Sequence, residues 1–248
     1  MPTRPRSRPS SATRRSGAWP HQLRLPGQAA APEGPVDLSM LFLLHLALRR
    51  DVAAFAAEVR LVPVDDRGSW RRLARRWTLF ATALHHHHAV EDRWLWPALR
   101  DRATPDERAT LAAMGTGYGD LDGLLEAVAV GLDALAAGAG HDARAALAVR
   151  LVAARESLGR HLAHEETDAL GIAQARLTSG EWQALEAGFG EGLGVRDLVA
   201  MVPWALHGLA EHHRGELLSR SGRLHRVLWR LTRHGFARRE ARTFAQKA

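Results

Sequence analysis

The sequence contains no cysteine among its 248 residues. This absence excludes disulfides, cysteine-ligated zinc, cysteine-held iron–sulfur clusters and thiol nucleophiles. Long apolar runs are also missing: a membrane helix needs roughly 20 apolar residues, whereas the most apolar stretch, MLFLLHLAL, is short and contains His45. We therefore expect a protein without a transmembrane segment, and the cytoplasm is its simplest location.

Several functional motifs are absent as well. The sequence has no G-x-S-x-G motif, no phosphate-binding loop and no glycine-rich dinucleotide fingerprint. Hydrolase, nucleotide-binding and dehydrogenase chemistry therefore receive no support. The formal charge is +7, with much of it in MPTRPRSRPSSATRRSG at the start and RHGFARREAR near the end. Disordered, solubilising tails are the favoured interpretation, weak contact with anionic surfaces is the alternative, and we expect no specific nucleic acid partner.

What remains is a composition rich in Ala, Leu and Arg, which favours helices. Residues 1–35 are rich in Pro, Ser, Arg and Gly and are predicted to be a disordered leader. Residues 36–178 contain long amphipathic patterns, and residues 179–248 form a helical C-terminal extension. The expected helices of the central region are 38–61, 69–102, 105–137 and 141–176. Short connections between them predict an all-α fold, an antiparallel up-and-down four-helix bundle with an additional C-terminal helical segment.

The run LHHHHAVEDRWLWP shows which histidines can point inward. His87 and Glu91 are four residues apart, so they lie on one face of a helix, together with the apolar stripe of that helix. His85 and His86 point away from this stripe. His88 lies on its flank, where pairing with Asp92 is the expected role.

The same spacing recurs later in the chain. In RHLAHEETD, His161 and Glu165 continue an apolar stripe, and the first expected helix carries His45 on its apolar face. Burying carboxylates in an apolar bundle is costly unless they are paired or bind a metal. Imidazoles and carboxylates that converge between helices are the ligands of iron or manganese pairs. We therefore predict a buried metal site.

These residues resemble the hemerythrin-like HHE cation-binding family. The resemblance spans about residues 36–178 and rests on His45, HHAVEDRWLWP and HLAHEE. It implies a non-haem di-iron centre that binds O2 or NO, or that takes part in iron or redox sensing. It further implies that His45, His87 and His161 are terminal ligands and that Glu91 and Glu165 are bridging carboxylates. Mononuclear iron or manganese stay open as alternatives.

The third expected helix departs from the family pattern. It carries Tyr118, the single tyrosine of the chain, where the family would supply a histidine. Two interpretations stay open: a lost ligand whose ring fills space, or a phenolate ligand to ferric iron. Asp122, one turn later, is a candidate substitute carboxylate.

Three functions compete at this point. A binding or sensing protein for a small diatomic ligand is favoured because no substrate-specific motif is present. A di-iron oxidase or peroxidase is the enzymatic alternative, and a metal-free bundle acting as an interaction module is the third. No partner protein is indicated. The basic segment GRLHRVLWRLTRHGFARR is expected to dock on the bundle, with binding to a membrane surface or a partner as the alternative.

Overall fold

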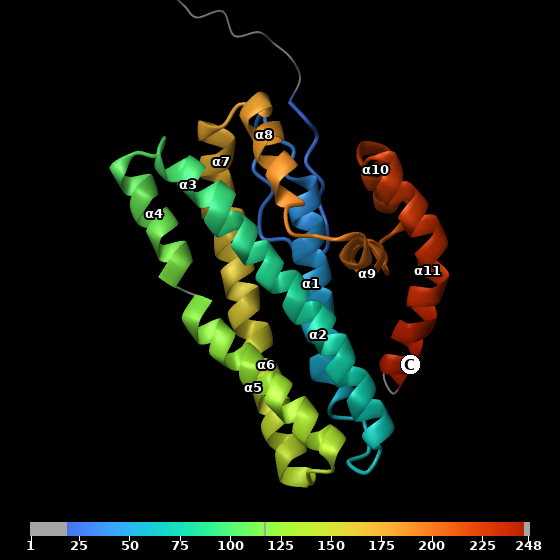
Figure 1. Cartoon of the computed structure of the whole chain (residues 1–248). Coiled ribbons are helices and arrows are strands. Elements are labelled where there is room, and N and C mark those ends of the chain that lie inside the picture. Colours follow the sequence, from blue (N-terminus) through green and yellow to red (C-terminus); the bar gives the residue numbers. More distant parts are fainter. Residues whose placement is uncertain (1–18, 117, 246–248) are drawn as a thin grey trace, which may run out of the picture.

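The computed structural model describes residues 19–116 and 118–245, without the side chains of residues 115, 116 and 118–120. Within these ranges the chain forms helices and connecting segments, and no strand (Figure 1). None of the described helices is long and apolar enough to cross a membrane. The all-helical fold class predicted from the sequence is therefore confirmed.

The central region follows the predicted helical ranges closely, with local interruptions. The first helix is α1 (Ser39–Glu58). The second consists of α2 (Arg67–Val90), a π-helical turn η1 (Glu91–Leu95) and α3 (Trp96–Arg100), which continue one another. Asp66 starts this helix, because its side chain accepts a hydrogen bond from the Ser69 backbone N–H at 2.9 Å.

The remaining helices of the central region show the same pattern. The third range contains α4 (Pro105–Thr116) and α5 (Tyr118–Ala137), on either side of residue 117. The fourth consists of α6 (His141–His164), a second π-helical turn η2 (Glu165–Ala169) and α7 (Leu170–Arg176).

The long helices pack on one another through their apolar stripes. Helix α5 lies against both α2 and α6, and α1 lies against α6 (Figure 1). The core between them is formed by fully buried leucine and aromatic side chains, among them Phe42, Phe55, Phe80, Leu84, Leu151 and Leu158. This packing holds the ends of α2 and α6 beside α1.

The segment before α1 differs from the predicted disordered leader over residues 19–35. It has no regular secondary structure, yet Leu23 and Val36 are buried, and Gln22 donates to the Val36 carbonyl at 2.8 Å. The Gln174 side chain on α7 accepts a hydrogen bond from the Val36 backbone N–H at 3.0 Å. Buried leucines and side-chain hydrogen bonds therefore tie residues 19–38 to α7. Residues 1–18 of the predicted leader lie outside the described residues.

The C-terminal extension contains α8 (Ser179–Phe189), α9 (Val195–Leu206), α10 (Glu211–Arg220) and α11 (Arg223–Thr243). It docks on the central helices through a buried polar cluster. Asp51 on α1 accepts hydrogen bonds from Trp204 Nε1 and from Arg76, both at 2.6 Å. Arg76 also binds Glu240 on α11. Of the two roles considered for the basic segment, docking is the one that the structure shows.

Candidate metal centre

Four buried side chains from three parts of the fold converge between the helices. His45 comes from α1, His87 from the end of α2, Glu91 from the start of η1 and Glu165 from the start of η2. One nitrogen or oxygen atom of each lies within 4.8 Å of those of the other three. The sequence predicted all four as site residues, and the structure brings them together.

Glu165 lies between the two histidines. Its Oε2 is 3.4 Å from His45 Nε2 and 3.8 Å from His87 Nε2, and the two imidazole centroids are 5.1 Å apart. His87 Nδ1 is 3.4 Å from Glu91 Oε1. The same helix turn therefore supplies a nitrogen and a carboxylate to one small volume.

These donors fit a divalent or trivalent cation. His45 Nε2, His87 Nε2 and both carboxylate oxygens of Glu165 are buried and make no hydrogen bond of good geometry within the described part of the chain. Leaving such groups buried without a partner is costly. Imidazole nitrogens mixed with carboxylate oxygens are ligands typical of iron, manganese or zinc. A metal ion would satisfy all of these atoms at once.

Both glutamates of the site occupy the first position of a π-helical turn. Glu91 opens η1 and Glu165 opens η2. A π turn inserts one residue into an α-helix and changes the direction of the side chains around it, and such turns are frequent at functional sites. The sequence reasoning predicted uninterrupted helices here and missed both turns.

A third acidic residue, Glu166, orients His45. His45 Nδ1 lies 2.8 Å from Glu166 Oε1, and Arg49 donates to the two oxygens of Glu166 at 2.6 and 3.0 Å. The Ala29 backbone N–H also donates a hydrogen bond to the Glu166 carboxylate, at 2.6 Å. A carboxylate that holds one nitrogen of an imidazole leaves the other directed toward a metal.

The sequence reasoning missed Glu166 and Arg49, although signals for both were present. Glu166 is the second glutamate of HLAHEE, and Arg49 lies one helical turn after His45.

The electrostatics of His45 differ from those of the other imidazoles. Burial alone would lower the pKa of His45, but Glu165 and Glu166 outweigh it and raise that pKa to about 9. Burial would likewise raise the pKa of Glu165, yet His45 and His87 hold it below its usual value. His45 therefore carries a proton at neutral pH as long as no cation replaces it.

His161 and His88 extend the cluster on one side. The His88 ring lies 5.3 Å from that of His161 and 5.5 Å from that of His87. Burial, reinforced by the neighbouring His161, lowers the pKa of His88 to about 4, and burial also lowers the pKa of His161. Both imidazoles are therefore neutral at pH 7, as metal ligands must be.

The four histidines of the HHHH run lie in different environments. His88 is buried and Asp92 is exposed, and the predicted pairing of the two stays a prediction. His85 is exposed, as predicted. His86 Nε2 lies 3.0 Å from the carbonyl oxygen of Phe189 on α8.

The third-helix position stays a prediction. Tyr118 begins α5, but its side chain lies outside the described residues, so neither interpretation of it is tested. Asp122 has an exposed side chain. An exposed carboxylate does not fit a buried ligand position, so the structure does not support Asp122 as a substitute ligand.

The comparison with known protein families agrees with this geometry. Residues 37–173, more than half of the chain, match the family described as Hemerythrin HHE cation binding domain. No curated protein and no solved structure matches the chain.

Proposed function

Because the chain belongs to the hemerythrin HHE cation-binding family, we propose that it is a non-haem iron protein that binds O2 or NO, or senses iron or redox state, without catalytic turnover. The observation that carries the proposal is the buried group of His45, His87, Glu91 and Glu165. It is the one such group among the described residues. We also propose that the central helices form the antiparallel four-helix bundle typical of the family.

The proposed ligands divide between two iron positions. His45, His87, Glu91 and Glu165 would hold one iron, and His161 would contribute to a second iron position, which Tyr118 would join if its phenolate is a ligand. Glu91 and Glu165, each at the start of a π turn beside the cluster, would hold the metal through their carboxylates. Ferrous iron in such a site supplies reversible binding of a diatomic ligand and one-electron chemistry.

The protein's own residues prepare the site in three ways. Glu166 and Arg49 fix the orientation of His45. The buried imidazoles His87 and His88 stay neutral, because burial lowers the pKa of each. Leucine side chains such as Leu84, Leu158 and Leu162 are fully buried on the same helices and exclude water from their surroundings.

Metal analysis of the purified protein, combined with its absorption spectrum, tests the proposal. We expect about two irons per chain, because the family's centre is a di-iron one, with near-ultraviolet bands of a bridged ferric pair. Protein that is isolated without metal and does not take up added ferrous iron would refute it and favour the metal-free interaction module. A stoichiometry of one iron would correct the proposal to a mononuclear site.

Two further measurements resolve the alternatives left by the sequence. A visible absorption band that disappears in Tyr118→Phe would identify a phenolate ligand, whereas an unchanged spectrum would identify Tyr118 as a lost ligand. Mixing the reduced protein with O2 or peroxide separates a binding protein from an enzyme. A single stable adduct supports binding or sensing, and repeated turnover supports an oxidase or peroxidase.

A further inference from the structure

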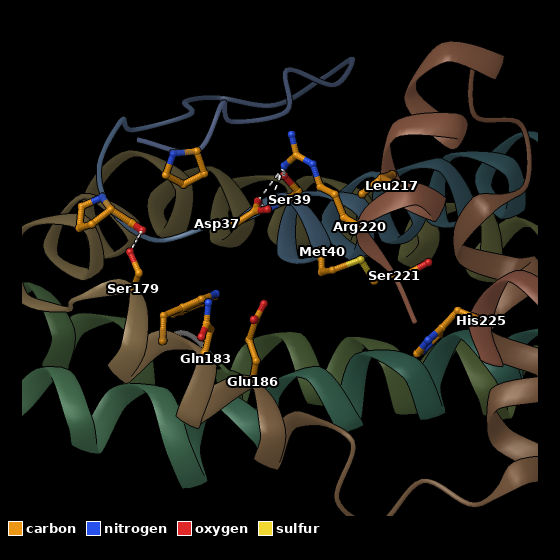
Figure 2. A pocket seen from close by; sticks show the side chains of 13 residues that line it. Asp37, Ser39, Met40, Ser179, Gln183, Glu186, Leu217, Arg220, Ser221 and His225 are labelled. Carbon is orange, nitrogen blue, oxygen red and sulfur yellow. Dashed lines mark hydrogen bonds and ion pairs between the residues drawn. The ribbon is translucent and has the colours of Figure 1, made fainter. Parts of the chain in front are cut away.

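Helix α11 uses only one of its faces to dock on the rest of the chain. This inner face carries the buried residues Leu228, Phe236 and Glu240. His225, in the first turn, lies on the same side and points into a cavity that α1 and α10 also line (Figure 2). The helix runs along the edge of the described part of the molecule (Figure 1). Its opposite, outer face is left to contact the surroundings.

Three apolar side chains lie on the outer face of α11. Leu224, Val227 and Leu231 are 53%, 51% and 76% exposed. Their spacing of three and then four residues places them on one stripe of the helix. Single exposed apolar residues are normal on protein surfaces, whereas exposed apolar side chains that are grouped together mark contact sites. We call these three residues the α11 stripe.

The same helix carries an uncompensated positive charge. All seven of its arginines have exposed side chains: Arg223, Arg226, Arg230, Arg233, Arg238, Arg239 and Arg242. None of them forms an ion pair with an acidic residue in the described part of the chain. The one acidic residue of α11, Glu240, is buried and paired with Arg76. The α11 stripe is therefore flanked by positive charge.

The positive charge continues from α11 onto α2. Arg72 and Arg75 of α2 line a cavity of about 420 Å³ together with Arg239 and Arg242 of α11. Glu240 also lines this cavity, but Arg76 already neutralises it. Two helices that are distant in the sequence thus present arginines to the same anion.

The combination of apolar side chains and arginines restricts what can cover this face. A second copy of the chain would place arginines against arginines. A nucleic acid would pair with the arginines but would leave the α11 stripe without an apolar environment. An anionic bilayer accommodates both, since aliphatic side chains enter the acyl boundary while guanidinium groups pair with headgroup phosphates.

We propose that the outer face of α11 binds the surface of an anionic phospholipid membrane. The helix lies in the membrane plane, with the α11 stripe in the acyl boundary and the exposed arginines on the headgroup phosphates. Docking on the central helices and contact with the membrane are compatible, because they use opposite sides of one helix. The proposal does not depend on the function proposed for the metal centre.

Vesicle flotation of the full-length protein, as isolated, tests this assignment. One set of vesicles contains phosphatidylcholine alone, and the other contains phosphatidylcholine with about one third phosphatidylglycerol. We expect binding to the anionic vesicles to be tighter by about tenfold or more, because each arginine near an anionic surface adds attraction. Equal affinity for the two sets, or no binding to the anionic vesicles, would overturn the proposal.

Single substitutions separate the apolar contact from the charge. Leu231→Gln removes the most exposed member of the α11 stripe, and Arg230→Gln removes one exposed charge beside it. Each should lower the affinity for anionic vesicles by about fivefold, without changing the melting temperature. Val149→Gln and Arg155→Gln make matching changes at exposed positions of α6 and should leave the affinity unchanged.

Three results would contradict the proposal. If Leu231→Gln binds anionic vesicles as tightly as the unmodified protein, the attraction is a general effect of charge. If sedimentation without vesicles shows a dimer that Leu231→Gln abolishes, the α11 stripe is an interface between copies of the chain. Tighter binding to a DNA duplex than to anionic vesicles would identify nucleic acid as the partner.

Discussion

At the scale of single residues, the least expected feature is the partner of His45. Glu166 is the last residue of the HLAHEE block, but the sequence assigned it no role, and it is fully buried and bound by His45, Arg49 and Ala29. A carboxylate behind a ligating imidazole fixes the tautomer and the direction of the ring. Glu166 is therefore a positioning residue for the proposed metal ligand His45.

Replacing Glu166 tests this role. Glu166→Gln should lower iron affinity by about 10- to 100-fold, the effect usual for loss of such a partner. Affinity is measured by competition with a chromophoric chelator. Glu156→Gln on the exposed face of α6 serves as the control and should have no effect. An unchanged affinity in Glu166→Gln would show that packing alone holds His45 in place.

The raised pKa of His45 predicts how metal affinity depends on pH. His45 has a pKa of about 9 in the metal-free protein, since Glu165 and Glu166 favour its protonated form. Binding of a cation must displace that proton, so affinity should rise with pH below about 9. One released proton corresponds to about a tenfold increase per pH unit. Titrations with ferrous iron at pH 6, 7 and 8 check this, and a flat profile would contradict it.

The sign of the effect on stability follows from the same pKa. A histidine whose folded-state pKa lies above its unfolded value stabilises the metal-free protein fully below about pH 6.5. This stabilisation is lost as the pH rises through about 9.

At the scale of elements, the π turns η1 and η2 distinguish the two helices that supply glutamates. Each turn begins at a proposed ligand, and the helix resumes beyond it as α3 or α7. A π turn weakens the regular hydrogen bonding of a helix, so it persists where function or packing requires it. We infer that the turns set the direction of Glu91 and Glu165.

Removing one residue from η1 tests this inference. Deletion of Asp92, which is exposed, should convert the π turn into regular α-helix and keep the apolar residues on either side in phase. We expect iron affinity to fall at least tenfold while the melting temperature is maintained. Asp92→Ala keeps the chain length and should retain full affinity. A deletion variant that binds iron normally would show that the π turn is not needed for the site.

At the scale of the whole molecule, the C-terminal extension is an integral part of the fold. The Asp51–Arg76–Glu240 cluster links α1, α2 and α11. The indole N–H of Trp204 on α9 donates a hydrogen bond to the Asp51 carboxylate of this cluster. All four side chains are buried. Phe244 adds an edge-to-face contact with Phe55 in the core, with 5.2 Å between the ring centroids.

Loss of the Asp51 charge should therefore destabilise the whole protein. Asp51→Asn leaves Arg76 with one carboxylate instead of two and weakens the acceptor for Trp204. We expect a loss of about 3 kcal/mol in the free energy of unfolding, as is typical when one partner of a buried ion pair is removed. Urea denaturation measures it, with the exposed Asp133→Asn as control. A loss equal to that of the control would mean that the extension docks without this cluster.

Much of the fold and part of the site were predictable because helical periodicity is local. The spacing of His87 and Glu91, and of His161 and Glu165, placed each pair on one face of a helix. That argument used only residues one turn apart. The leader was not predictable in the same way. Its Pro-rich composition indicated disorder, but Leu23 and Leu25 are buried in the core.

The sequence by itself determined the all-helical class and the approximate helical ranges, and it included the four residues of the candidate metal centre among its predicted ligands. These follow from side-chain type and from a period of 3.6 residues, both of which act within a few turns. Only the tertiary structure decided that Glu166 and Arg49 hold His45, that His88 packs on His161 and that α11 docks through Arg76. Those contacts join residues far apart in the chain, and their partners are set by how the helices pack in space.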